Sequence, residues 1–358
     1  MSARPRIWER LASSYDDLEW NRRTDQEIYL EIQRQRPMWL RIGNFYRRNL
    51  SLLRMLPPGQ LVLWKLEHFG DDAANAVRML ISSGLQPESF VAELFASGHT
   101  IVPYTFTTTG RDNLVRDVPL LRTMDIQILP LAHNMLIRRA GRTELRASLG
   151  LGEDDILVGA GGRLFPEKGI DEIATWFLRQ RIDAHLLCSA IPADDRQSVE
   201  SVRIDWQTRS GTSDSARLHL RFGHYDQPDW MSSFYAAIDV MLVNSMTDSW
   251  GRMASEAITL GVPAIVRRAD CGTNELAPNV VLVNGFEQLS TAEFAAAFDQ
   301  ARKRASRLQE YMAAHYDISV VRRQFHELLR EYVPASHRAE FIDLAAELHP
   351  SVDRMLTF

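Results

Sequence analysis

The chain has 358 residues, 45% of them hydrophobic, which is enough to bury one or two cores and fits two domains better than one. The formal net charge of -5 excludes a global positive field that would draw the chain to nucleic acid or to an anionic membrane, so any such contact has to be local. Two cysteines, Cys188 and Cys271, argue against a disulfide framework or a thiolate metal site. Because there is no apolar signal core and no run of about 18 apolar residues, we expect a cytoplasmic protein.

The first 58 residues are predicted to form a helical segment without a strand. Apolar residues recur at three- and four-residue spacing from Trp39 to Leu53, and "LPPGQ" ends the segment. Residues 32–59 contain six arginines and no acid, with aromatic residues between them. This part is a candidate for peripheral contact with the inner face of an anionic membrane or, less readily, with nucleic acid. The alternative is a pair of amphipathic helices that packs on a sheet with its arginines toward water.

Residues 59–140 are expected to form an N-terminal α/β lobe on the acceptor side. Strands and helices alternate there, which implies a parallel sheet with right-handed crossovers. In chain order we expect a first strand at 61–69, a helix at 71–84, a strand at 100–106, a helix at 111–123 and a strand at 126–131. The polar, Arg-rich stretch 132–153 is expected to be helical and to link the lobes.

Residues 141–330 are expected to form a doubly wound α/β lobe. The expected strands lie at 156–162, 184–190, 217–223, 240–245 and 263–268, and the expected helices at 171–181, 229–238 and 252–260. Most of the chain after residue 289 is predicted to be helical. Residues 331–358 are expected to form a C-terminal helix, with a return to the N-terminal lobe as one option.

The stretch "GAGGRLFPEKG" places Arg163 and Lys168 beyond glycines at the end of a predicted strand. Ligands of open α/β sheets bind at the carboxyl ends of strands, where a glycine such as Gly162 lets the backbone approach a phosphate. Arginine binds phosphate oxygens as a fork and lysine as a point charge, so the two side chains would hold one diphosphate together. The alternative is a solvated loop in which Lys168 pairs with Glu167 or Asp171.

The stretch "DSWGRMASEAITLGVPAIV" combines a turn, a helix and a buried strand, with Asp248 and Glu256 eight positions apart. The helix is expected to begin near Arg252, where free backbone amides attract anions and Gly251 permits close approach. Glu256, in the second turn, would accept hydrogen bonds from a ribose diol, and Asp248 would face another part of the same ligand. Each acid has a structural alternative: a turn or N-cap residue for Asp248 and a helix-surface acid for Glu256.

Together these motifs resemble the C-terminal domain of retaining GT-B glycosyltransferases of glycosyltransferase family 4. The resemblance rests on "GGRLFPEKG", "FYAAIDVMLVNS", the acid-x7-acid motif with "WG" inside it, and "SEAITLGVPAIV" followed by "CGTNEL". It implies a GT-B-like α/β fold with two Rossmann-like lobes, of which the N-terminal one is reduced and carries extra helices. It also implies the transfer of a sugar, with retention, from a nucleotide-diphosphate-sugar donor to a glycan, a lipid-linked intermediate or a natural product.

The resemblance further implies residue roles. Arg163 and Lys168 match the pair that holds the donor diphosphate and stabilises charge on the departing phosphate, and Asp248 matches the acid that contacts the donor sugar. The donor-binding residues that it implies are Gly162, Trp250, Gly251, Arg252, Glu256 and Glu275, with Glu256 at the ribose. No cofactor and no metal are expected, and the chain contains no Asp-x-Asp tripeptide.

Three features depart from the family. Asp248 stands where glutamate is usual, and the segment before the first predicted strand lacks the usual strand and glycine-rich loop. On the acceptor side, the histidine often found in the family has no clear counterpart; His68 and Thr107 are the candidates, although His68 also fits a structural histidine. The rival interpretation is therefore a non-catalytic protein that kept only the nucleotide-sugar-binding lobe. A weak likeness of "WERLASSYDDLEW" to segments before methyltransferase domains lacks the glycine-rich cofactor loop that it would require.

Overall fold

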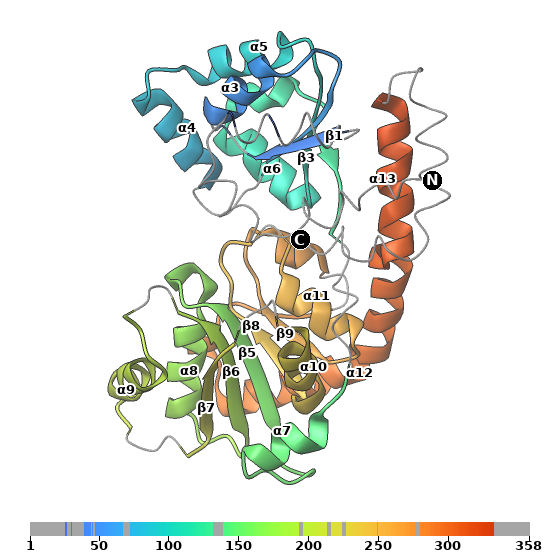
Figure 1. The fold of residues 1–358 in the computed structure, drawn as a ribbon. Helices are drawn as coiled ribbons and strands as arrows, with labels where there is room; N and C mark the ends of the chain where they lie inside the picture. Colours follow the sequence, from blue (N-terminus) through green and yellow to red (C-terminus); the bar gives the residue numbers. More distant parts are fainter. Residues whose placement is uncertain are drawn as a thin grey trace. The chain divides into compact units, whose positions relative to one another are not determined.

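The structure is a computed structural model that describes most of the chain between residues 39 and 332. The described residues are 39–43, 47–66, 72–131, 139–192, 196–212, 216–223, 227–248, 250–276 and 280–332, together with Gln26, Leu30 and Phe45. Contacts divide the chain into two units. Unit 1 comprises residues 1–132 and 316–358, and unit 2 comprises residues 133–315. Figure 1 shows the elements of each.

Unit 1 is built on a four-stranded parallel sheet whose strands follow one another in chain order. The strands are β1 (Trp39–Gly43), β2 (Leu61–Lys65), β3 (Thr100–Thr105) and β4 (Gln127–Ile128). The helices around them are α3 (Arg47–Met55), α4 (Asp72–Ser82), α5 (Pro87–Phe95), α6 (Thr108–Asp117) and the short η2 (Pro119–Thr123). Phe45, Trp64 and Phe90 form an aromatic core with ring centroids 5.2 to 6.0 Å apart. Burial of these rings packs α5 and the turn after β1 against the sheet.

Strand β1 corrects the expectation that the first 58 residues contain no strand. It pairs in parallel register with β2, so "LVLWK" is the second strand of this sheet and not the first. The apolar spacing fits a helix as well, but Leu40 and Ile42 alternate along β1 and both are buried. A short apolar run fits a helix or a strand equally well by sequence alone, and here the pairing with β2 makes it a strand. The helical part of the expectation is confirmed at α3, where Leu50 and Leu53 are buried.

The chain returns to unit 1 after the long helix α12 (Thr291–Tyr316), and α13 (Ile318–Tyr332) belongs to that unit. Nearly all of the expected helix at 331–358 lies outside the described residues. Among the described residues, no helix is both long enough and apolar enough to cross a membrane.

Unit 2 contains a six-stranded parallel sheet, which confirms the doubly wound lobe. Its strands are β5 (Leu157–Arg163), β6 (His185–Ile191), β7 (Leu218–Phe222), β8 (Val240–Val243), β9 (Ala264–Arg267) and β10 (Val281–Val283). Their spatial order is β10-β9-β8-β5-β6-β7, so the chain adds strands on one side of β5 and then on the other. The five expected strands are each found with bounds within two residues, and β10 is additional.

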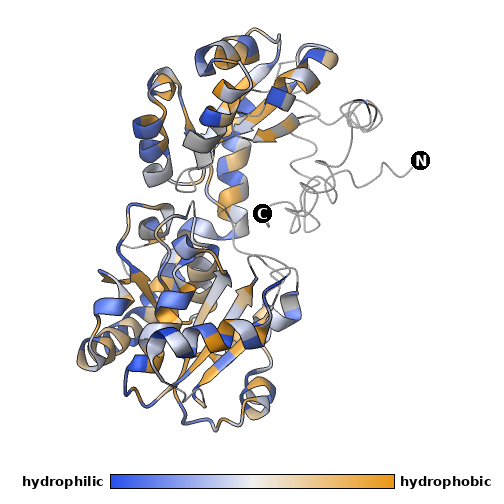
Figure 2. Cartoon of the chain, turned by 90° about the vertical axis from the view of Figure 1, so that its left-hand side faces the viewer, coloured by the Kyte–Doolittle hydropathy of each residue, from blue (hydrophilic) through white to orange (hydrophobic). Residues whose placement is uncertain are grey.

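Helices cover both faces of this sheet, as Figure 1 shows for α8 and α9 on one face and α7 and α10 on the other. These helices are α7 (Arg142–Ser148), α8 (Ile170–Arg179), α9 (Val199–Ser210) and α10 (Pro228–Ala237). The short helix α11 (Arg252–Thr259) follows β8. Figure 2 shows the strands as predominantly hydrophobic. Trp176 of α8 packs with Phe286 and Phe294 and donates its indole N–H to the carbonyl of Leu289 at 2.8 Å. Since this core is continuous, the strand ends that it supports form a fixed platform.

Helix α7 confirms that part of 132–153 is helical, but it is packed into unit 2, which differs from the expectation of a polar linker. Arg146 is only 1% exposed. Its guanidinium donates to the carbonyl oxygens of Ala237 and Gly152, both at 2.8 Å, and lies 3.4 Å from Asp239. A buried arginine is tolerated when its N–H groups are satisfied in this way. The network therefore ties α7 to the end of α10, immediately before β8.

Candidate functional site

The candidate site lies at the switch point of the unit 2 sheet, between the carboxyl ends of β5 and β8. In open doubly wound sheets, ligands bind outside the carboxyl ends of the strands where the strand order reverses. Here β5 ends at Arg163 and its neighbour β8 ends at Val243, and both strands run parallel. The two motifs that the sequence singles out follow these two strands. The topology thus explains why segments so far apart in the chain meet.

The end of β5 has no room for side chains at Gly161. A Cβ at this position would lie 2.6 Å from Cε of Met253 and 2.7 Å from the carbonyl oxygen of Ser189. The strand backbone therefore lies directly against α11. Arg163 is exposed, and its guanidinium lies 5.1 Å from the centre of the Phe165 ring, a cation–π contact that orients it.

Lys168 ends the short helix η3 (Pro166–Lys168), and its ammonium contacts the loop after β8. It lies 3.1 Å from Oδ2 of Asp248 and donates to the carbonyl of Thr247 at 3.0 Å. The amide of Met246 donates to the carbonyl of Glu167 at 2.8 Å, so the two loops are also joined through their backbones. The structure thus brings together Lys168 and Asp248, which the sequence analysis expected on one ligand.

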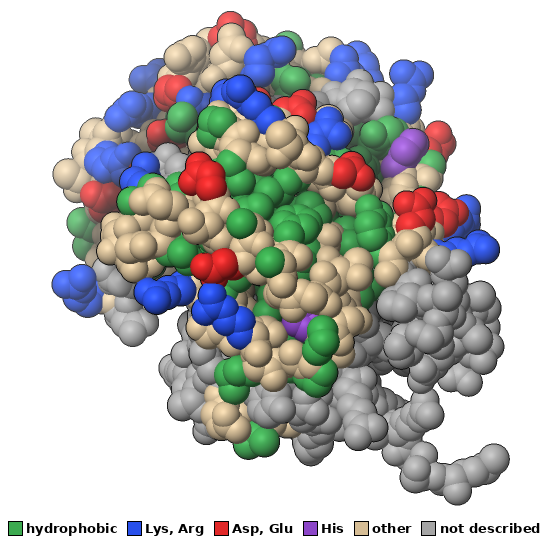
Figure 3. All heavy atoms as spheres, turned by 90° about the horizontal axis from the view of Figure 1, so that it is seen from above, with side chains coloured by type: hydrophobic (Ala, Val, Ile, Leu, Met, Phe, Trp, Pro, Cys, Tyr) green, Lys and Arg blue, Asp and Glu red, His purple; other side chains and the backbone are tan. Residues whose placement is uncertain are grey.

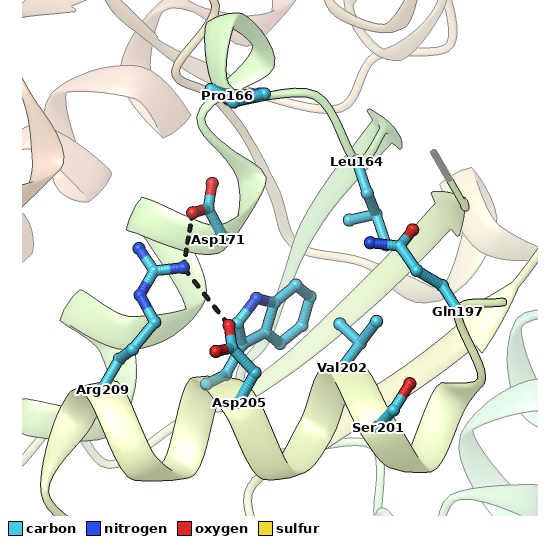
Figure 4. A pocket seen from close by; sticks show the side chains of 9 residues that line it. Leu164, Pro166, Asp171, Gln197, Ser201, Val202, Asp205 and Arg209 are labelled. Atoms are coloured by element: carbon cyan, nitrogen blue, oxygen red, sulfur yellow. Dashed lines mark hydrogen bonds and ion pairs between the residues drawn. The ribbon is translucent and has the colours of Figure 1, made fainter. Parts of the chain in front are cut away.

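The partner of Lys168 differs from the one in the solvated-loop alternative. That alternative paired Lys168 with Glu167 or Asp171, but the carboxylate of Asp171 pairs with Arg209 of α9 at 2.6 Å. Figure 4 shows this pair in a cavity of about 210 Å³ between α8, α9 and the loop after β5. Because Asp171 is in the first turn of α8, the pair holds the helix that begins directly after Lys168.

The turn before α11 is fixed by Asp248. Its Oδ1 accepts hydrogen bonds from the amides of Gly251 at 3.0 Å and Trp250 at 3.3 Å, and its carbonyl accepts from the amide of Gly272 at 2.7 Å. The expectation that Asp248 could be a turn residue is therefore confirmed, and the same carboxylate also bonds Lys168. Trp250 is 3% exposed, so its ring is part of the packing of unit 2.

Gly251 is the N-cap of α11 and needs to be glycine for two reasons. Its φ of 74° lies in the left-handed region, and a Cβ would lie 2.5 Å from Oγ1 of Thr273. The first helical hydrogen bond of α11 runs from the amide of Ser255 to the carbonyl of Gly251. The amides of Arg252, Met253 and Ala254 precede that bond, and such first-turn amides attract anions.

Glu256 is a buried carboxylate, so the helix-surface alternative is wrong. It is 3% exposed, and its Oε2 accepts a hydrogen bond from the hydroxyl of Tyr235 at 2.7 Å. Burial raises the pKa of Glu256 to about 6, while the charge of Arg252 and the Tyr235 hydrogen bond oppose this rise. Glu256 is therefore mainly ionised at neutral pH and can accept hydrogen bonds from hydroxyl groups.

Tyr235 is the site residue that the sequence analysis missed. It lies in "FYAAIDVMLVNS", one of the motifs that resemble the family, where the spacing of the aromatic residues predicts the core face of a helix. Nothing local distinguishes a tyrosine that bonds a distant carboxylate from one that only packs. The signal becomes visible once α10 and α11 are adjacent in space.

Of the remaining predicted residues, Glu275 belongs to a short helix that borders the turn of Asp248, whereas Thr107 lies in unit 1. Glu275 lies in the short helix η4 (Gly272–Leu276) of unit 2. Thr107 is fully buried in unit 1 and caps α6, since its Oγ1 accepts from the amide of Gly110 at 3.0 Å. His68 lies outside the described residues. Within the described ranges, no three His, Cys, Asp or Glu side chains gather in a group that could hold a metal ion.

Comparisons with known proteins find similarity at the level of structure. No family model matches the chain, and no curated protein matches it in sequence. Sucrose-phosphate synthase from Thermosynechococcus elongatus aligns with 86% of this chain and 77% of its own, at 16% identity and a TM-score of 0.64. HepE from Anabaena in complex with UDP-glucose aligns with 86% of this chain and 82% of its own, at 16% identity and a TM-score of 0.65.

A third solved structure shows the same similarity. The α,α-trehalose-phosphate synthase (UDP-forming) from Burkholderia vietnamiensis covers 86% of this chain and 79% of its own, at 14% identity and a TM-score of 0.60. At such identities the likeness establishes the fold and not the reaction. The two parallel sheets of this chain match the two Rossmann-like lobes of these glycosyltransferases, and the chain therefore has the GT-B fold.

Proposed function

We propose that the chain transfers a sugar from a nucleoside diphosphate sugar to an acceptor, with retention of the anomeric configuration. The observation that carries this proposal is the convergence of Lys168, Asp248 and the start of α11 at the switch point, with the buried Glu256 in the next turn. A diphosphate needs cations and backbone amides, and a ribose needs hydrogen-bond acceptors. HepE has been solved with UDP-glucose and with UDP, which makes UDP-glucose the first donor to test.

In the proposed reaction, Arg163 and Lys168 bind the diphosphate and stabilise the charge that grows on it as the bond between sugar and phosphate breaks. Lys168 exchanges its contact with Asp248 for the donor, which leaves the Asp248 carboxylate to contact the sugar. The acceptor hydroxyl forms the new bond to the anomeric carbon, and its proton goes to the departing phosphate. The scheme assigns no protein nucleophile and no metal. Gly162, Trp250, Gly251, Arg252 and Glu275 complete the proposed donor site, and His68 is the proposed acceptor-side residue. Thr107 is left out of the proposal, because it is buried as the cap of α6.

The test is a panel of UDP-glucose, GDP-mannose and ADP-glucose, measured by calorimetry and by release of nucleoside diphosphate with mixed acceptors. We expect micromolar to millimolar binding of one donor and acceptor-dependent release of its diphosphate. Absence of binding to all three donors would contradict the proposal.

A second candidate is a protein that binds nucleotide sugars without transferring them. The observation in its favour is that the Asp248 carboxylate is already bonded to Lys168 and to two turn amides. Such a protein would be stabilised against heat by the donor but would release no nucleoside diphosphate with any acceptor. The panel above separates the two candidates.

The proposal also includes peripheral contact of residues 32–59 with an anionic membrane. The guanidinium of Arg47 donates to the carbonyl of Ser83 at 3.2 Å, and Arg54 pairs with Glu93, so both bind protein groups. Figure 3 shows basic and acidic side chains interspersed with hydrophobic ones on the face seen from above. Sedimentation with vesicles of anionic lipid tests this contact: the native chain is expected to bind the vesicles, and Arg47→Glu is expected to lose binding.

A further inference from the structure

Tyr235 and Glu256 form a buried pair on two helices of the same unit. Tyr235 on α10 is fully buried, and its hydroxyl lies 2.7 Å from Oε2 of Glu256 on α11. The Tyr235 ring also packs edge to face on Phe234, with centroids 5.3 Å apart. Because both helices are fixed on the sheet, this hydroxyl holds the carboxylate in one orientation.

The hydrogen bond leaves the carboxylate able to bind a ligand. An ionised carboxylate offers about four acceptor positions, and the Tyr235 hydroxyl uses one of them. A hydrogen bond to an ionised acceptor is stronger than one between neutral groups, and more so away from water. Tyr235 therefore favours both the orientation and the ionised form of Glu256 without blocking the group.

We propose that Tyr235 is a positioning residue of the donor site, which acts through Glu256 to present an ionised carboxylate to the ribose hydroxyls. This inference rests on the proposed function and deepens it, because it explains how Glu256, which is 3% exposed, stays ionised and able to bind a neutral diol. Tyr235 itself does not touch the donor in this scheme. Its substitution should act only where Glu256 is present.

Few other groups influence the ionisation of this carboxylate within the described part of unit 2. Tyr235 comes from α10 and Arg252 from its own helix, and both favour the ionised form. Strand β8 presents apolar residues to α11, and Arg267, the charged residue of β9, pairs with Glu172. Helix η4 adds Glu275, which is partly exposed. Among these residues, Tyr235 is the neutral one, and its hydroxyl donates a hydrogen bond directly to Glu256.

The experiment measures, by calorimetry between pH 5 and pH 8, the affinity for whichever of UDP-glucose, GDP-mannose and ADP-glucose the native chain binds most tightly. These donors suit the range because their diphosphate, esterified at both ends, has no ionisation near pH 6. The proteins are the native chain, Tyr235→Phe, Glu256→Gln and the double variant. Thr175→Val is the control, since it removes another buried hydroxyl of unit 2, on α8, that bonds the carbonyl of Asp171.

We expect Tyr235→Phe to weaken binding about tenfold at pH 6.5 and to move the midpoint of the pH profile up by about one unit. We expect no further loss when the same substitution is made in Glu256→Gln, and a native profile for Thr175→Val. A Tyr235→Phe profile equal to the native one, or an equal loss in both backgrounds, overturns the inference while the proposed function stands. If the native chain binds none of UDP-glucose, GDP-mannose and ADP-glucose, the proposed function and this inference both fail.

Discussion

The ammonium of Lys168 lies 3.1 Å from the carboxylate of Asp248, although eighty positions separate the two residues. Their side chains are 13% and 20% exposed, so water screens the pair only partly. The contact closes the loop after β5 onto the loop after β8. A donor diphosphate that binds Lys168 has to compete with this carboxylate.

The competition predicts a gain in affinity when the charge of Asp248 is removed. Asp248→Asn keeps an oxygen for the turn amides but weakens the pair with Lys168, so UDP is expected to bind up to about fivefold more tightly. Transfer should nevertheless become slower, because the substitution removes the carboxylate that we propose to contact the sugar. Calorimetry and a transfer assay measure the two effects. Weaker UDP binding in Asp248→Asn would contradict the competition.

The cations of the site are expected to act mainly in the transition state. Arg163→Ala and Lys168→Ala should each lower kcat about 10²- to 10³-fold, as loss of a charged oxyanion contact does. Arg181→Ala is the control, since this exposed arginine lies between α8 and β6, at the opposite end of the sheet. Native rates in both site variants would remove the two residues from the proposed mechanism.

The pKa of Glu256 predicts a pH-dependent cost to stability. Burial raises this pKa from 4.5 to about 6, so the folded chain binds the proton more tightly than the unfolded chain does. Stability therefore falls as pH rises from 4.5 to 6, by about 2 kcal/mol, and below pH 4.5 the cost is absent. We expect Glu256→Gln to stabilise the chain against urea at pH 7.5 by up to about that amount, and to give no such gain at pH 4. Equal effects at the two pH values would disprove the linkage.

A comparison of Gly251 with Gly211 separates the cost of a left-handed backbone conformation from the cost of a steric clash. Gly251→Ala combines a φ of 74° with a Cβ only 2.5 Å from Oγ1 of Thr273, whereas Gly211→Ala has a φ of 73° and no atom within 4 Å. Gly211→Ala should cost about 1 kcal/mol of unfolding free energy, and Gly251→Ala should cost at least about 1 kcal/mol more. Urea unfolding measures both values. Only Gly251→Ala is also expected to weaken UDP binding, because it shifts the start of α11.

Arg146 is predicted to be a stability residue without a direct role at the site. Arg146→Met removes a buried donor to the carbonyls of Ala237 and Gly152 and one of the two guanidinium groups that pair with Asp239, which should cost about 3 kcal/mol. Arg142→Met is the comparison, since Arg142 is 29% exposed on its side chain and should cost about 1 kcal/mol. Urea unfolding measures both. A larger loss for Arg142→Met would contradict the assignment.

The sequence alone predicted five of the six strands of unit 2, its helices α8, α10 and α11, and the two motifs that follow β5 and β8, but it did not predict α9 or β10. Buried parallel strands are continuous apolar runs, and helices begin at characteristic residues. Both can therefore be predicted from residues that are close together in the chain. The same local reading missed β1, because the apolar residues of this stretch also fit the helical spacing that continues into α3, and pairing with β2 decides between the two.

Tertiary structure decided the contacts of the site. The pairing of Lys168 with Asp248, the burial of Glu256 and its bond to Tyr235 all depend on strand order and on which helices become neighbours. The residue types indicate which chemistry is available. Ion pairing and pKa values depend on distance and burial, which are set only when segments distant in the chain are packed together.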